Sequence, residues 1–238
     1  CVSTDKAANP VNVMGASKRI MEDLIFSYSD VFPVKTARFA NVAFSNGSLP
    51  AGFLERIAKQ QPISAPSDIK RYFVSPEESG QICMLACMLG ENRAIFFPKL
   101  EEEQMMTFDS IAENLLHEYG YQILKCQSDE EAIDKSEDLK KGSNLYPVHF
   151  SVSDTSGEKP FEEFYTDTET VDMARFYALG VITDKEKCNQ DKLSNLLSDL
   201  GNLFQNQNVK KEDVVRIIGA YLPNFSHIET GRSLDIKM

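Results

Sequence analysis

Helix-type and strand-type patterns alternate along the first half of the chain. Residues 13–28 place apolar side chains such as Ile20 and Leu24 at helical spacing, and residues 34–42 form a run that is typical of a buried strand. Residues 76–89 again predict a helix, and the apolar run at residues 94–97 predicts a further strand. Strands that alternate with helices form a mostly parallel sheet that helices cover. The sequence therefore predicts an α/β fold.

The same kinds of pattern continue through the rest of the chain. A charged stretch, residues 128–141, is expected to be a solvated helix or a loop rather than an acidic docking site. The other predicted elements are helices at residues 50–60, 107–119, 191–205 and 211–221, and strands at residues 62–73, 121–126, 146–152 and 161–165.

Composition limits the class of protein. With 238 residues, 42% of them hydrophobic, the chain is long enough to bury a sizeable core. A net charge of −11 and a pI near 4.8 argue against a nucleic-acid partner, because phosphate binding needs clustered Lys and Arg. The longest apolar run, residues 82–89, is far shorter than the ~20 residues that span a bilayer. The sequence thus predicts a soluble globular protein.

Cysteine and histidine usage points to a reduced compartment and no metal. The five cysteines form no CxxC pair, and their odd number favours a cytoplasmic protein over a disulfide framework. Cys83 and Cys87 lie one helical turn apart, and we expect both to pack in the core. His117, His149 and His227 are distant from one another in the sequence and lack ligand-like neighbours, so no metal site is predicted.

The first eighteen residues carry the densest set of chemically active side chains. Ser3-Thr4-Asp5-Lys6-Ala7-Ala8-Asn9-Pro10 combines hydroxyl groups, a carboxylate and an amine, and Met14-Gly15-Ala16-Ser17-Lys18 follows on a predicted helix. Both stretches resemble the catalytic region of nucleotide-sugar 4,6-dehydratases of polysaccharide biosynthesis. These are extended short-chain dehydrogenases/reductases, typified by UDP-N-acetylglucosamine 4,6-dehydratase. The resemblance extends over residues 1–170 or so.

Three further stretches are similar to the same family. They are residues 38–42 with the loop at 45–48, residues 70–73, and Gly157-Glu158-Lys159 with Glu162-Glu163. The resemblance implies cofactor binding by Ser3, Lys18, Phe39, Asn41 and Val42, and substrate binding by Asn41, Ser45, Gly47, Ser48, Arg71, Glu158 and Lys159. For several of these residues, a purely structural role is the alternative to ligand binding.

Asn41 and Ser48 are also suited to capping turns. Arg71 is also suited to a surface ion pair worth about 0–1 kcal/mol, and Glu158-Lys159 to an ordinary polar turn.

The chemistry that the resemblance implies is a dehydration with an internal redox cycle. NAD takes a hydride from sugar C4, a base removes the C5 proton, an acid protonates the departing 6-hydroxyl, and the hydride returns to C6. The family pattern assigns the base to Lys6 and the acid to Asp5. For these roles the pKa of Lys6 must fall from ~10.4 and that of Asp5 must rise from ~3.9, by burial and by the nearby nicotinamide charge. Because opposite charges side by side shift both values the wrong way, the pair must be partly desolvated or held apart.

Met14 departs from the family pattern. Lys18 has the spacing of the lysine in a Tyr-x-x-x-Lys pair, so Met14 stands where many members have the tyrosine, and some members carry Met. A thioether does not accept the proton of the sugar 4-hydroxyl as a tyrosinate does. We therefore expect Thr4 or Ser3 to relay this proton and Lys18 to act on the cofactor ribose. The alternative is that Met14 only packs and that catalysis is impaired.

The resemblance also implies a domain organisation. Residues 1–48 and 77–100 are expected to form the C-terminal part of a doubly wound NAD-binding domain. Residues 49–76 and 101–187 are expected to form a smaller, interleaved substrate domain, and residues 188–238 a helical extension. The sequence contains no glycine-rich βα turn to cradle the NAD pyrophosphate, so we expect it to be part of a longer polypeptide and inactive alone.

Expected partners are NAD, a nucleotide sugar and a second copy of the chain, which the family pattern places against the helix that carries Lys18. Two other functions stay open. A nucleotide-sugar epimerase shares the oxidation at C4 but needs no acid for a leaving hydroxyl, so Asp5 and Lys6 speak against it. A non-catalytic sugar-nucleotide binder is favoured by Met14 and by the missing glycine-rich turn.

Overall fold

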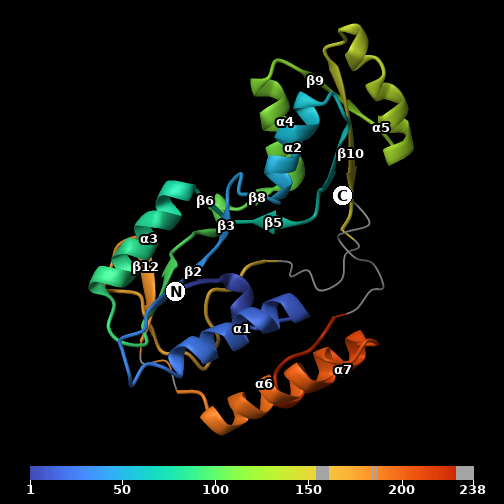
Figure 1. Ribbon diagram of the computed structural model, residues 1–238. Helices are drawn as coiled ribbons and strands as arrows, with labels where there is room; N and C mark the ends of the chain where they lie inside the picture. The colour runs from blue at the N-terminus through green and yellow to red at the C-terminus, as the bar shows by residue number, and fades with distance from the viewer. Residues whose placement is uncertain (154–160, 184, 186, 229–238) are drawn as a thin grey trace. The chain divides into compact units, whose positions relative to one another are not determined.

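The computed structural model describes residues 1–153, 161–183, 185 and 187–228. Contacts within the chain divide it into two compact units, which are described separately (Figure 1). The first unit contains residues 1–40, residues 77–100 and the described residues from 155 to 238. The second contains residues 41–76 and the described residues from 101 to 154. Each unit therefore joins segments that are far apart in the sequence.

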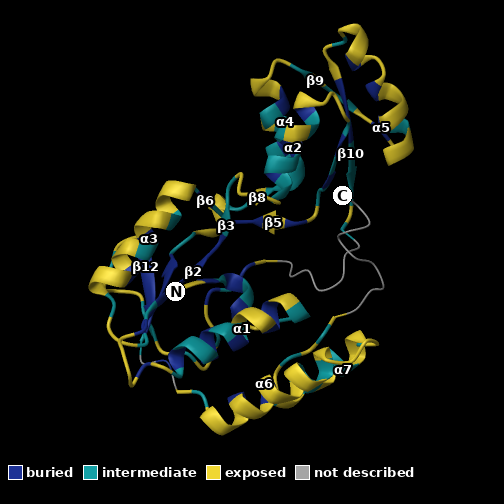
Figure 2. Cartoon of the chain, in the orientation of Figure 1, coloured by how far each residue is buried: buried dark blue, intermediate teal, exposed yellow. Residues whose placement is uncertain are grey.

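A five-stranded sheet forms the centre of the first unit. Its order is β1 (Val2–Thr4), β2 (Thr36–Phe39), β7 (Ile95–Pro98), β12 (Leu179–Ile182) and β11 (Val171–Asp172). The first three strands run parallel, and β12 and β11 each pair antiparallel with their neighbours. Every residue of β2, β7 and β12 is buried, which is typical of strands covered on both faces (Figure 2).

Helices α1 (Val13–Phe26) and α3 (Pro76–Leu89) cover opposite faces of this sheet. Ala37 and Phe39 of β2 pack in one core cluster with Ile82 and Ala86 of α3. Between them, Arg38 faces the other way and bonds to Glu22 of α1. Successive residues of a strand point to opposite faces, so this alternation fixes which helix lies on which side.

Helices α6 (Gln190–Phe204) and α7 (Lys211–Tyr221) complete the first unit. They pack against each other and against α1, and they share a core cluster with it (Figure 1). The side chain of Asn189 caps α6 by accepting a hydrogen bond from the backbone of Lys192, 3.0 Å away. Both helices were predicted, within one residue at each end.

The second unit contains three small sheets and three α-helices. The parallel sheet has the order β4 (Ile63–Pro66), β10 (Leu145–Ser151) and β9 (Gln122–Lys125). The hydrophobic core of the second unit lies between this sheet and helices α2 (Leu49–Ala58) and α4 (Phe108–Glu118). The remaining elements are the parallel pair β3 (Asn41–Val42) and β6 (Phe73–Val74), the antiparallel pair β5 (Lys70–Arg71) and β8 (Met106–Thr107), helix α5 (Asp129–Ser136), and single 3₁₀ turns at Glu102–Gln104 and Leu139–Lys141.

The predicted α/β fold class is confirmed, and the charged stretch at residues 128–141 is the solvated helix α5 followed by a 3₁₀ turn. The predicted strand at residues 161–165 is wrong. That segment forms no strand; instead, the rings of Phe164 and Tyr165 pack on Phe97, and the Phe164 carbonyl accepts a hydrogen bond from Arg38. The strands of the sheet in this region are β11 and β12, neither of which was predicted.

The two compact units differ from the expected domain bounds in three places, one of which is that the described residues from 188 to 228, expected as a separate extension, belong to the first unit. Residues 41–48 belong to the second unit, because β3 pairs with β6 there. The described residues from 161 to 187, expected in the substrate domain, belong to the first unit, because β11 and β12 extend its sheet.

The expectation that Cys83 and Cys87 both pack in the core is correct only for Cys83, which lies partly buried against the core cluster. Cys87 is exposed, as are Met84 and Met88, because α3 presents only one face to the sheet. Within the described residues, no helix is both long enough and apolar enough to cross a membrane.

Candidate functional site

The candidate site starts where two parallel strands end. Thr4, the last residue of β1, lies opposite Phe39, the last residue of β2. After Thr4 the chain turns through a 3₁₀ helix, η1 (Asp5–Ala7), and then enters α1. Ligands of parallel α/β sheets bind outside the carboxyl ends of the strands. The chemically active residues 4–6 are therefore placed at the edge of the sheet where a ligand is expected.

Thr4, Asp5 and Lys6, here called the strand-end cluster, are in direct contact. The Thr4 hydroxyl donates to Asp5 Oδ1 over 2.5 Å, and Lys6 Nζ lies 3.3 Å from the same oxygen. The Asp5 side chain is only 5% exposed, whereas that of Lys6 is 43% exposed. The predicted acid and base thus form one ion pair with a buried carboxylate and a half-exposed amine.

Gly15 allows α1 to begin close to this cluster. A Cβ atom at Gly15 would lie 2.8 Å from the backbone oxygen of Lys6 and 3.3 Å from Cβ of Pro10. Asn12 caps the helix by accepting a hydrogen bond from the Gly15 backbone nitrogen at 2.8 Å. Only glycine fits this approach, so the Met-Gly-Ala-Ser-Lys stretch has a structural role that the sequence analysis did not identify.

Met14 and Lys18 lie together on an exposed side of α1. They are four residues apart, so they share one face of the helix, and Met14 is 54% exposed. Met14 is therefore not buried in the packed interior of the first unit. Lys18 presents its charge to solvent on the same side.

The other two residues predicted for the cofactor in the first unit are buried. Phe39 packs in the core between the sheet and α3. The Ser3 hydroxyl donates to Oε1 of Glu22 over 2.5 Å. Ser3 therefore contacts a side chain of α1, while the hydroxyl of its neighbour Thr4 contacts Asp5.

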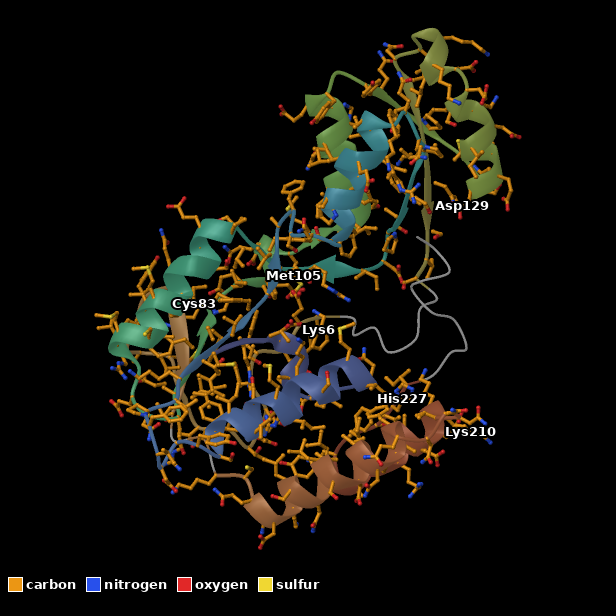
Figure 3. All side chains as sticks on the ribbon, viewed as in Figure 1. Lys6, Cys83, Met105, Asp129, Lys210 and His227 are labelled. Atoms are coloured by element: carbon orange, nitrogen blue, oxygen red, sulfur yellow. The ribbon has the colours of Figure 1, made fainter. Side chains whose placement is uncertain are left out.

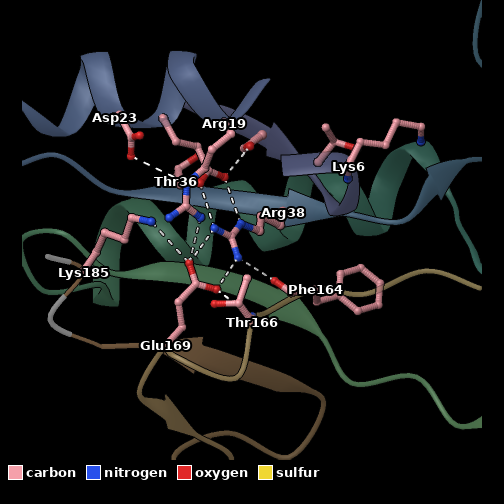
Figure 4. A network of polar contacts seen from close by, with 12 residues as sticks. Lys6, Arg19, Asp23, Thr36, Arg38, Phe164, Thr166, Glu169 and Lys185 are labelled. Carbon is pink, nitrogen blue, oxygen red and sulfur yellow. Dashed lines mark hydrogen bonds and ion pairs between the residues drawn. The ribbon is translucent and has the colours of Figure 1, made fainter. Parts of the chain in front are cut away.

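A buried ion pair lies behind Ser3. Arg38 of β2 is fully buried, and all five of its N–H donors have acceptors (Figure 4). Glu22 accepts from Nε at 2.9 Å and from Nη2 at 2.8 Å. Glu169 accepts from Nη1 and from Nη2, and the Phe164 carbonyl accepts from Nη1, each at 2.8 Å. Arg38 thereby joins β2, α1 and the chain segment before β11.

Glu169 and Asp23 extend this pair into a network. Glu169 Oε1 also lies 3.2 Å from Arg19 Nη1 and 3.3 Å from Lys185 Nζ. Arg19 lies 3.7 Å from Asp23, whose carboxylate accepts from the Tyr221 hydroxyl at 3.2 Å. We call Arg19, Glu22, Asp23, Arg38, Glu169 and Lys185 the buried charge network. Its three cations and three anions balance.

Burial and pairing compete in setting the charge states of the network. Burial raises the pKa values of Glu22 and Glu169, but the hydrogen bonds and charge of Arg38 lower them by more, so both lie below the ordinary value. Burial lowers the pKa of Arg38, and its two carboxylates raise it by more. For Asp23 burial prevails and the pKa is raised, while burial lowers the pKa of Lys185.

In the second unit, Asn41 and Ser48 both make hydrogen bonds within the protein. The Asn41 backbone and side-chain nitrogens both donate to the Tyr72 carbonyl at 3.2 Å, which joins β3 to β6. The Ser48 hydroxyl caps α2 by accepting from Ala51 at 3.3 Å.

Ser45 is exposed, and Gly47 has a φ of 77°, a backbone conformation that favours glycine. Both residues lie in the turn between β3 and α2. Val42 pairs with Val74. Ser45, Gly47 and Ser48 therefore lie in one turn that directly follows β3.

Arg71 is buried. It belongs to β5, is 9% exposed, and donates from Nη1 to the Lys70 carbonyl at 2.8 Å. Glu158 and Lys159 lie outside the described residues. Their neighbour Glu163 accepts a hydrogen bond from Asn9 at 3.3 Å, which joins its segment to the loop before α1.

The described side chains support a cofactor site only in part. Thr4 offers a hydroxyl at the carboxyl end of β1, and Lys18 offers an exposed cation suited to a ribose hydroxyl. Ser3 is already engaged by Glu22 and Phe39 is buried, so their predicted side-chain contacts with NAD are not favoured. Among the described residues, no group of His, Cys, Asp and Glu side chains is arranged to hold a metal ion.

Comparison with known proteins identifies relatives across most of the chain. The family described as "Polysaccharide biosynthesis protein" matches residues 1–179. The "Probable polysaccharide biosynthesis protein EpsC" of Bacillus subtilis is 29% identical over 167 residues, which are 69% of this chain and 27% of that protein. A "UDP-N-acetylglucosamine 4,6-dehydratase (inverting)" of Campylobacter jejuni is 25% identical over 204 residues, 81% of this chain and 56% of that enzyme.

Among solved structures, Pen from Bacillus thuringiensis has a similar fold, with a TM-score of 0.57 and 19% identity. The match covers 94% of this chain and 61% of Pen. This chain thus spans between about a quarter and three-fifths of the length of the proteins that it matches here.

Proposed function

The chain belongs to the polysaccharide biosynthesis protein family, and from this membership we propose that it takes part in the NAD-dependent dehydration of a nucleotide-activated N-acetylhexosamine to a 4-keto-6-deoxy sugar. UDP-N-acetylglucosamine is the substrate that we propose first, because a relative with 25% identity is named for its dehydration. The observation that carries the proposal is the strand-end cluster, in which an acid and a base meet at the carboxyl end of β1.

Asp5 and Lys6 together hold the one proton that the elimination needs. With the proton on Lys6 they form the ion pair seen in the structure. With the proton on Asp5, Lys6 is a neutral amine able to take the C5 proton, and Asp5 is an acid able to give its proton to the departing 6-hydroxyl. One elimination converts the neutral pair into the ion pair. When the hydride returns to C6, Lys6 gives a proton back to C5, and the proton that leaves the sugar 4-hydroxyl replaces the one that Asp5 gave away, so the neutral pair is restored.

Thr4 is our candidate for the proton of the sugar 4-hydroxyl. Its hydroxyl bonds to Asp5, so a proton received by Thr4 has a path to a carboxylate. Ser3, the other residue considered for this role, donates to Glu22 instead. Met14 has no acid–base group, so this proposal gives it no proton to carry.

NAD, when bound, would accept the hydride from C4 and return it to C6. We assign the cofactor ribose to Lys18 by its exposed cation. For the nucleotide sugar we propose Asn41, Ser45, Gly47, Ser48 and Arg71 of the second unit on residue chemistry alone, since the arginine suits a diphosphate.

The test incubates the intact protein that carries this sequence with NAD and UDP-N-acetylglucosamine in deuterated water and follows C4, C5 and C6 by NMR. We expect deuterium at C5 and a new C6 methyl signal. An inverted C4 without a methyl signal would instead identify an epimerase. Binding of the sugar nucleotide without turnover would identify a non-catalytic binder, and either result contradicts the proposal.

The variants Asp5→Asn and Lys6→Met should each lower kcat by about 10²–10⁴-fold, the usual contribution of a positioned acid or base. Matched controls are Glu55→Gln and Lys59→Met, which break an exposed ion pair on α2. They should leave the rate unchanged. Equal losses in both pairs would mean that the strand-end cluster has no special role.

A further inference from the structure

Helix α1 has two buried faces. One carries Glu22 and Phe26 toward the sheet, where Glu22 bonds to Ser3 and Arg38. The other is an apolar stripe at three- and four-residue spacing, which lies against α6 and α7 rather than against the sheet. Its members are Val13, Ala16, Ile20 and Leu24, and the residues opposite them include Leu193, Leu196, Ile217 and Ile218.

Polar contacts bind this C-terminal segment along the whole length of α1. Toward the end of α1, Asp23 accepts two of these contacts.

 The Asp23 carboxylate accepts from the Tyr221 hydroxyl, and the Asp23 backbone carbonyl accepts from Cys188 Sγ, both over 3.2 Å. At the start of α1, the backbone nitrogen of Ile228 donates to the Val11 carbonyl over 3.0 Å. Residues 188–228 are therefore fastened to α1 at both ends as well as along the stripe.

Helices α6 and α7 pack on the apolar stripe of α1 and leave the side that carries Met14 and Lys18 exposed. Met14 and Lys18 remain exposed while the stripe is buried (Figure 3 shows the side chains that fill the space between α1 and the α6–α7 pair). Covering the stripe is thus compatible with a role of Lys18 in ligand binding. It is not compatible with a second copy packing on the same stripe.

We propose that α6 and α7 act as the built-in partner of α1: they occupy the apolar face on which a second copy of the chain would otherwise pack. An uncovered stripe of this kind, on a helix whose opposite face is already buried, favours association with another apolar surface. A second α1 offers the same stripe and suits a two-fold pairing. While residues 188–228 are seated, copies do not associate through α1.

The test uses Ser17→Cys as a reporter, because Ser17 is exposed and flanks the stripe. A mixture of ¹⁴N- and ¹⁵N-labelled chains is treated with a short bismaleimide, and cross-links between copies are mapped by peptide mass spectrometry. Mapping separates the reporter from the exposed native Cys1 and Cys87. In this background we expect no cross-link between copies at position 17, and abundant cross-linking there would overturn the proposal without any further variant.

The second step compares neighbouring leucines of α6. Leu196 is 3% exposed and faces α1, whereas Leu197 is 41% exposed. Leu196→Glu should release α6, raise cross-linking at position 17 several-fold, and raise the mass in sedimentation toward twice that of the parent protein. Leu197→Glu should behave like the parent chain.

Hydrogen exchange of residues 190–204 reports whether α6 is released, and exchange in β2 reports whether the first unit stays folded. If Leu196→Glu unfolds β2, Ile218→Glu on α7 takes its place. Release of α6 with β2 intact, but without new cross-links at position 17, would contradict the proposal.

Discussion

Ser3 and Thr4 are neighbours on β1, yet their hydroxyls serve two different groups of charges. Each donates to a carboxylate over 2.5 Å, Ser3 to Glu22 and Thr4 to Asp5. Because successive residues of a strand face opposite ways, the two carboxylates belong to separate surroundings. Glu22 is fully buried and joins the buried charge network, whereas Asp5 contacts a half-exposed lysine.

The difference lies in how fully the cation is bound. All five donors of Arg38 have protein acceptors, so this cation has no capacity left for a ligand. Lys6 has three donors, and the structure describes one side-chain contact for it, to Asp5. A saturated network stabilises a fold, while an open pair can exchange a proton with a substrate. We therefore expect substitutions in the first to affect stability and in the second to affect activity.

The largest expected effect is that of Arg38→Leu on stability. It would leave Glu22 and Glu169 buried without their main partner, which typically costs about 3–5 kcal/mol. Urea unfolding followed by circular dichroism measures the change. Lys59→Met, in an exposed pair with Glu55, is the control and should leave the unfolding midpoint unchanged. Similar midpoints for both variants would show that the network does not stabilise the fold.

The next effect is a loss of stability in acid. The pKa values of Glu22 and Glu169 are lower in the folded chain than their ordinary value of 4.5, so these groups stabilise the fold above that pH. Their contribution is lost as the pH falls below 4.5, and we expect a decrease on the order of 2–3 kcal/mol in the free energy of unfolding.

Asp23 acts with the opposite sign. Burial raises its pKa in the folded chain, so its protonation favours folding and partly offsets the loss in acid. Asp23→Asn should therefore make the decrease steeper in urea unfolding measured from pH 7 to pH 3. A free energy of unfolding that stays constant below pH 4.5 would contradict the assigned charge states.

A third effect connects the two regions of the comparison through Gly15. A methyl group there would lie 2.8 Å from the Lys6 backbone oxygen, so Gly15→Ala must move either α1 or the strand-end cluster. We expect a loss of about 1–3 kcal/mol in stability, as for overpacking elsewhere, together with a loss of activity. Gly52→Ala is the control, because a Cβ atom at Gly52 meets nothing within 4 Å. Unfolding midpoints and initial rates equal to those of the control would contradict this role for Gly15.

The sequence predicted the elements well where periodicity is local. Helices α1, α3, α4, α6 and α7 were each expected within about two residues of their observed ends. Strand β12 was missed although Leu179-Gly180-Val181-Ile182 is an apolar run, because the family resemblance assigned this region to the substrate domain. Residues 161–165 were expected to continue a strand, but the rings of Phe164 and Tyr165 pack on Phe97 instead.

The strand-end cluster was predicted from residues that are adjacent in the sequence. The buried charge network behind it was not predicted. The residues of the strand-end cluster are neighbours in the sequence, so a short stretch was enough to suggest them. Arg38 and Glu169 are 131 residues apart, and no local pattern pairs one glutamate of an acidic chain with one arginine. The sheet register places Ser3 opposite Arg38, and the segment before β11 brings Glu169 to the same arginine.

The smallest effects, and the sharpest test of the comparison, come from the two neighbouring hydroxyls. Ser3→Ala removes a hydrogen bond to the buried Glu22 and should cost about 1–2 kcal/mol of stability, with kcat unchanged. Thr4→Val removes the hydrogen bond to Asp5 and should lower kcat about tenfold, the equivalent of one hydrogen bond of about 1.4 kcal/mol, with stability nearly unchanged. Urea unfolding and initial rates measured on both variants separate the two roles. If each variant lost stability and activity in the same proportion, the two hydroxyls would belong to one coupled site, and the division between a structural network and a chemical pair would be wrong.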